Sequence, residues 1–137
     1  MSFTTTWENE VLNYLFGNVA ITLPSSFFIG LHVGTTAPAN NGSGIVEPSG
    51  GYQRVAVARN QTNFPVTSTG QIANGTKVNF PQATANWGTP THWFIANVQR
   101  GGAGEKVYLV GQLGTSKTVL KGDTPSFDAN GLLVSLK

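Results

Sequence analysis

The segment that most constrains the fold is residues 92–98, HWFIANV, which runs unbroken through aromatic and β-branched residues. Such a run is typical of a strand buried on both faces, because large apolar residues separate its polar members. A strand of this kind needs a neighbour on each side, so we expect it to be central in a sheet. The loop that precedes this strand, residues 86–90, is expected to face a neighbouring protein through Trp87 and Pro90.

Other strand-like segments surround this run, separated by clusters of turn residues. We expect strands at 27–33, 52–58, 76–80, 106–113 and 132–136, with a brief one at 117–120. About seven or eight short strands, with no second helix for a parallel crossover, predict a mainly β chain. The expected architecture is an antiparallel β-sandwich or jelly-roll-like single domain over residues 1–137. The candidate core residues are Phe28, Ile29, Leu31, Val55, Phe80, Trp93, Ile95, Leu109 and Val134.

One helix is predicted, at residues 5–16. Thr5 followed by Glu8 fits a capping box, and Gly17 with Asn18 is a natural helix end. The helix either covers one end of the β core or docks into a neighbouring subunit. Its apolar residues recur at helical spacing and are Trp7, Val11, Tyr14 and Leu15, of which the first three are candidate contact residues.

The longest loop is residues 35–51, rich in Pro, Gly, Asn and Ser. Loops longer than about 12–15 residues without secondary structure are usually functional or mobile. We therefore expect this loop to be exposed and to provide a contact surface. Its candidate contact residues are Asn41 and Ile45, together with Tyr52 directly after it.

Composition excludes several classes of protein. Hydrophobic residues make up 39% of the chain and charged residues 10%, which argues against disorder. The net charge is only +2, and its basic residues are scattered, so no nucleic-acid partner is expected. No apolar run approaches the roughly 20 residues that span a bilayer, and the N-terminus does not resemble a secretory signal. There are no cysteines, so thiolate metal sites are excluded.

No catalytic or metal site emerges from the motifs. The two histidines, His32 and His92, each lie between apolar residues of a predicted strand, where a histidine is usually structural. We therefore predict neither enzyme activity nor a metal or cofactor. Two alternatives stay open: copies of one histidine around a trimer axis could hold an ion, and aromatic rings could line a carbohydrate groove. The rings considered are Trp7, Trp87, Trp93, Tyr52 and Tyr108.

A set of short segments, taken in order, carries a family resemblance. They are NYLFGN at 13–18, FIGLHVG at 28–34, Ala37-Pro38, GGYQRV at 50–55, FPQATANWG at 80–88, THW at 91–93 and GDTP at 122–125. Together they resemble a family of small tailed-bacteriophage virion proteins that carry tail-fibre or head-decoration labels. The similarity runs from about Trp7 to the C-terminus.

The resemblance implies a structural, non-catalytic protein of the virion, made in the host cytoplasm. Its expected partners are other copies of itself, in a homotrimer, and the major capsid or tail proteins. Our first hypothesis is a capsid decoration or cement protein attached to the particle through protein–protein contacts. The alternative is a tail-fibre or tail-associated module that recognises a host-surface glycan.

Overall fold

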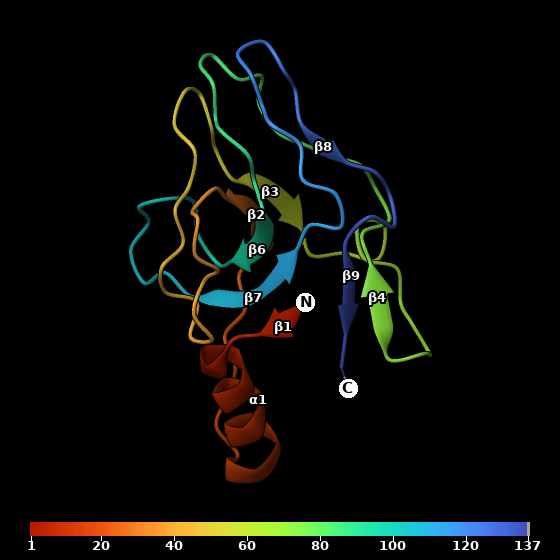
Figure 1. Cartoon of the computed structure of the whole chain (residues 1–137). Helices are drawn as coiled ribbons and strands as arrows, with labels where there is room; N and C mark the ends of the chain where they lie inside the picture. The colour runs from red at the N-terminus through yellow and green to blue at the C-terminus, as the bar shows by residue number, and fades with distance from the viewer. Residues whose placement is uncertain (137) are drawn as a thin grey trace.

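The computed structural model describes residues 1–136, and it is mainly β with antiparallel sheets and one helix (Figure 1). The predicted fold class is confirmed at that level. The elements in chain order are β1 (Ser2–Phe3), α1 (Thr5–Gly17), β2 (Ser26–His32), β3 (Val55–Ala58), β4 (Gln71–Ala73), β5 (Val78–Asn79), β6 (His92–Ala96), β7 (Val107–Gln112), β8 (Ser126–Phe127) and β9 (Leu133–Ser135).

The main sheet has five strands in the order β1-β7-β6-β2-β3, and every pairing is antiparallel. Strand β6 is central, as its sequence predicted. Its Trp93 lies opposite Leu31 of β2 and Gly111 of β7. The β6–β7 pairing is the predicted hairpin, with a register shift between Ile95 and Ala96.

Both faces of the main sheet are covered. One face carries Ile29, Trp93 and Leu109 into the larger core, where they meet side chains from the second half of the chain. The opposite face carries Phe94 and Ala96, against which Ile45 of the 35–51 loop packs. The large aromatic and aliphatic residues of β6 therefore alternate between two buried environments.

The layer over the larger core is built from two ribbons and long connections. Strand β4 pairs with β9, and β5 pairs with β8, each as a separate two-stranded sheet. The expected strand at 117–120 is reduced to a single bridge between Gly88 and Val119. The short strands β1, β4 and β8 were not predicted, because two or three residues give no readable alternation. A full sandwich or jelly roll stays a prediction.

Helix α1 projects from the end of the molecule opposite several long loops (Figure 1). Its N-cap is Thr4, whose hydroxyl accepts from the amide of Trp7 at 3.3 Å, so the capping box predicted from Thr5 and Glu8 is wrong by one residue. Asn18 ends the helix in the left-handed conformation, with φ 54°. Thr4 also donates to the carbonyl of Val107, which ties the helix start to β7.

The predicted core residues fall into two groups. Those that are buried are Ile29, Leu31, Phe80, Trp93, Ile95 and Leu109. Val55 and Val134 are half-buried against the same core. Phe28 is half-buried in β2 but packs into neither core, because its neighbours Phe27 and Ile29 take the inward face.

Candidate functional site

The loop at 35–51 is anchored to the sheet by an ion-pair cluster around Arg54. The Arg54 side chain is 3% exposed, and its Nε and Nη2 atoms donate to the two carboxylate oxygens of Glu47 at 2.8 and 3.0 Å. Nη2 also donates to Glu105 at 3.0 Å, and Nη1 to the carbonyl of Val98 at 2.9 Å. Burial alone would lower the pKa of Arg54, but the hydrogen bonds and negative charge of Glu47 and Glu105 outweigh it and raise that pKa.

Two further groups complete this anchor. The hydroxyl of Tyr52 donates to Glu47 at 2.7 Å and accepts from the amide of Leu31 at 3.0 Å. Burial, together with the nearby charge of Glu47, raises the pKa of Tyr52, so the phenol stays protonated and can donate. The Arg54 guanidinium also lies over the Phe94 ring, 5.0 Å from its centroid. The cluster thus joins the loop to both β2 and β6.

His32 holds the same loop from strand β2. Its ring is fully buried; Nδ1 accepts from the amide of Val46 at 2.9 Å, and Nε2 lies 2.8 Å from the carbonyl oxygen of Thr36. With these partners Nδ1 acts as the acceptor and Nε2 as the donor to the Thr36 carbonyl. His92 packs edge-on against it with 5.6 Å between centroids. Both ring nitrogens of His32 are occupied, so this residue has no free atom for an ion at a symmetry axis.

Helix α1 is exposed along most of its length. Trp7 packs edge-on against Tyr108 of β7, at 5.0 Å between ring centroids, and Val11 is half-buried. No residue of the helix is buried. The helix also presents an exposed apolar row, which consists of Leu12, Leu15 and Phe16 with Val19 just beyond the helix. We call this row the helix stripe.

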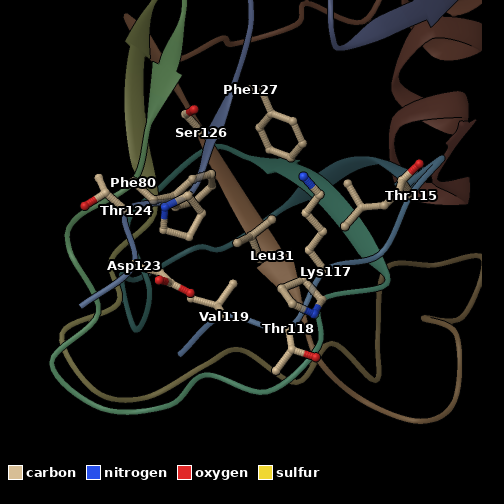
Figure 2. A pocket seen from close by; sticks show the side chains of 13 residues that line it. Leu31, Phe80, Thr115, Lys117, Thr118, Val119, Asp123, Thr124, Ser126 and Phe127 are labelled. Carbon is tan, nitrogen blue, oxygen red and sulfur yellow. The ribbon is translucent and has the colours of Figure 1, made fainter. Parts of the chain in front are cut away.

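A groove of about 450 Å³ lies between the segments at 113–119 and 123–127, over Leu31 and Phe80 (Figure 2). Its polar side chains are Thr115, Lys117, Thr118, Asp123, Thr124 and Ser126. Phe127 of β8 forms part of the wall and is half-buried. The groove therefore combines an apolar base with hydroxyls and one charge of each sign.

The structure relocates several predicted contact residues. Tyr52, Trp87 and Pro90 are buried, which corrects the expectation that they face a neighbouring protein. Trp87 is 4% exposed because its ring packs edge-on against Tyr52 and its Nε1 donates to the carbonyl of Gly50 at 2.9 Å. The contact candidates that stay wholly or partly accessible are Trp7, Val11, Tyr14, Asn41 and Ile45.

The aromatic carbohydrate groove considered from the sequence is not formed by the rings proposed for it. Trp87, Trp93, Tyr52 and Tyr108 are all buried, so none of these four can stack on a sugar, and the half-buried Trp7 packs edge-on against Tyr108. The observed groove is lined instead by Phe127, which no sequence pattern marked, and by the buried Phe80. The Arg54 cluster was also missed. Its one signal was an arginine in the strand-like run YQRVAVA, where the two-residue alternation places that side chain opposite the inward valines.

Two kinds of feature are absent from the part of the chain that the structure describes. Among residues 1–136, no group of three or more His, Cys, Asp and Glu side chains is placed to hold a metal ion. In the same part of the chain, no helix has the length and apolarity to cross a bilayer.

A family model described as Podophage GP4 fiber I protein gp80 matches residues 2–135, which include α1 and every strand. A search of curated proteins found no match. The phage resemblance predicted from the short segments is confirmed. The chain therefore belongs to the podophage GP4 fiber I protein gp80 family and is a phage virion structural protein.

Proposed function

We propose that the protein is a non-enzymatic subunit of a phage tail fibre, held in the virion by protein–protein contacts. The family match supports the fibre role better than the capsid-decoration role, which was our first hypothesis from the sequence. The proposed partners are other copies of this chain and the tail proteins to which the fibre attaches.

The structural observation that supports attachment by protein–protein contacts is the helix stripe. Phe16 is 85% exposed and Leu15 63%, on a 13-residue helix that leaves the body of the molecule (Figure 1). A contiguous exposed apolar patch of this kind marks a site of association. Covering each such side chain contributes roughly 1.5–3 kcal/mol. The helix is thus built to be covered in the assembled state.

We infer that the stripe packs against the same stripe of other copies. Its members are spaced by three and four residues, the spacing by which helices pack together. Neutral Asn9 and Asn13 border the stripe, and Glu10 is paired with Lys106 of its own domain. Glu8 is the one acidic residue in line with the stripe, one turn before Leu12, so packing is expected over the last two turns. A homotrimer would bring these helices together around one axis.

Matched leucine variants test the association. Leu12 and Leu120 are 54% and 52% exposed, the first on the stripe and the second in a distant loop. We expect Leu12→Gln to shift the protein toward monomer in sedimentation velocity while Leu120→Gln behaves as wild type. An oligomer unaffected by Leu12→Gln, or an equal loss in both variants, contradicts the role of the stripe. Deletion of the N-terminal segment is a poorer test, because β1 and Thr4 are bonded to β7.

The position on the particle tests the fibre role itself. Gold-labelled antibodies against this protein should decorate the tail appendages of purified phage in electron micrographs. Labelling spread evenly over the capsid would instead support decoration of the shell and overturn the proposal.

A further inference from the structure

The groove between segments 113–119 and 123–127 has a rigid frame. The carbonyls of Asp123 and Pro125 accept from the amides of Ala83 and Phe80 at 2.8 and 2.9 Å, which fixes one wall. Val119 exchanges backbone hydrogen bonds with the segment at 87–88, which fixes the other. Because both walls are bonded to the same 80–88 segment, the groove is formed before any ligand arrives. A preformed site loses little conformational entropy on binding.

The groove has the size and composition of a small-ligand site. Its volume of about 450 Å³ falls in the range of roughly 300–1,000 Å³ that is usual for such sites. Its base is apolar, formed by side chains such as Leu31 and Phe80, and Phe127 adds an accessible aromatic ring. A ligand that fills it needs apolar faces as well as polar edges.

Hydroxyl groups surround the base. Thr115, Thr124 and Ser126 are exposed and their side chains make no hydrogen bond within the described part of the chain, whereas Thr118 is paired with Thr89 at 2.8 Å. A hydroxyl both donates and accepts, so it matches another hydroxyl in either direction. Sugars present many hydroxyls around rings with apolar faces, which fits this combination.

Lys117 and Asp123 place one positive and one negative charge at the groove. Figure 2 shows Lys117 and Asp123 on opposite sides of Leu31, with the Lys117 side chain extended toward the Phe127 ring. Within residues 1–136 Lys117 makes no ion pair. One oxygen of Asp123 accepts from the amide of Leu120 at 2.9 Å, and the other has no partner in the same residues. The groove thus offers a cation for an acidic group and a carboxylate oxygen for a sugar hydroxyl.

We propose that this groove binds a saccharide that bears an acidic group. The sugar ring lies over Phe127 and Leu31, its hydroxyls bond to Asp123 and the free threonine and serine hydroxyls, and its acidic group pairs with Lys117. The inference rests on the proposed fibre function only for its biological purpose, which would be contact with a host-surface glycan. The binding test uses the isolated protein, so it can fail while the fibre role holds.

The test begins with an array of acidic and neutral glycans, followed by NMR titration of the intact protein with digalacturonic acid and with neutral galactobiose. We expect acidic glycans to bind preferentially and digalacturonic acid to shift the amide signals of groove residues. Lys117→Gln should weaken the affinity for digalacturonic acid about tenfold, because it removes about one charge-assisted hydrogen bond. The affinity for galactobiose should not change.

Lys121→Gln is the matched control, because Lys121 is exposed, lies four residues away and does not line the groove. It should bind digalacturonic acid as wild type does. Three results would overturn the proposal: no acidic glycan bound in either assay, shifts that fall outside the groove, or equal effects of the two lysine variants.

Discussion

Removal of the Glu47 charge tests how the long loop is held. The Glu47 carboxylate is 7% exposed and receives two hydrogen bonds from Arg54 and one from Tyr52. In Glu47→Gln the buried guanidinium keeps only Glu105, which is 39% exposed, as a charged partner at hydrogen-bonding distance. Loss of one member of a buried ion pair costs about 3–5 kcal/mol, because the other charge is left uncompensated.

Urea denaturation measures this directly. With a slope of about 1–3 kcal/mol per molar urea, we expect the midpoint to fall by on the order of 2 M. Glu105→Gln is the matched control, since it removes an equal charge from the same guanidinium at a more exposed position. Its cost should not exceed about 1 kcal/mol.

A double variant separates the charge from the packing. Adding Arg54→Met to Glu47→Gln removes the stranded charge, and the glutamine carbonyl still accepts from Tyr52. The double variant should therefore recover part of the lost stability, as replacement of a buried pair often does. If Glu47→Gln and Glu105→Gln cost the same, or the double variant is no more stable than Glu47→Gln alone, the anchoring role of the cluster is refuted.

Three further changes follow from local geometry. Gly111→Ala should destabilise the fold by about 1–3 kcal/mol in the same denaturation assay, because the added Cβ would lie 2.3 Å from the Trp93 ring. Gly114 has open space around it, so Gly114→Ala is the control and should change the stability by no more than about 0.5 kcal/mol. Thr4→Val should cost about 1–2 kcal/mol through the lost helix cap, and retention of wild-type stability would contradict that role. Burial and the neighbouring His32 lower the pKa of His92 from its usual 6.5. As pH falls below that value the unfolded state takes up protons first, so the free energy of unfolding decreases. In His92→Gln this decrease from about pH 7 to 5 should be shallower, and an unchanged decrease would exclude His92 as a cause of the pH dependence.

Local pattern was sufficient for the longest strands. The unbroken run at 92–98 indicated burial on both faces and a central position, and its β6 counterpart has both. The glycine-rich connection to β7 likewise indicated the hairpin. These features depend on neighbouring residues in the chain, so periodicity reports them.

Features made by distant residues could not be predicted. Arg54 meets Glu105 across 51 positions, and nothing local shows that the arginine turns inward. Trp87 was assigned outward because it lies in a loop beside Gly88, yet that loop is bonded to the segment around Val119 and its ring is buried. The groove arises from the same long-range loop contacts.

For helix α1 the sequence predicted the element but not what it packs against. Its existence and its C-terminal end at Gly17 and Asn18 were predicted, but an apolar face alone does not say what it packs against. Trp7 and Val11 are half-buried, whereas Leu15, one turn beyond Val11 on the same face, is 63% exposed. An amphipathic pattern identifies a face to be covered, and the structure shows that most of it is covered by nothing within residues 1–136.

The most direct test of the fibre role is a cryo-EM reconstruction of the phage particle that carries this protein. We predict density for this fold in a tail-attached fibre, with the helix stripe packed against neighbouring copies and the groove open to solvent. Density for the fold on the capsid shell would contradict the fibre role. Density in a fibre whose α1 helices face solvent would contradict the role of the helix stripe.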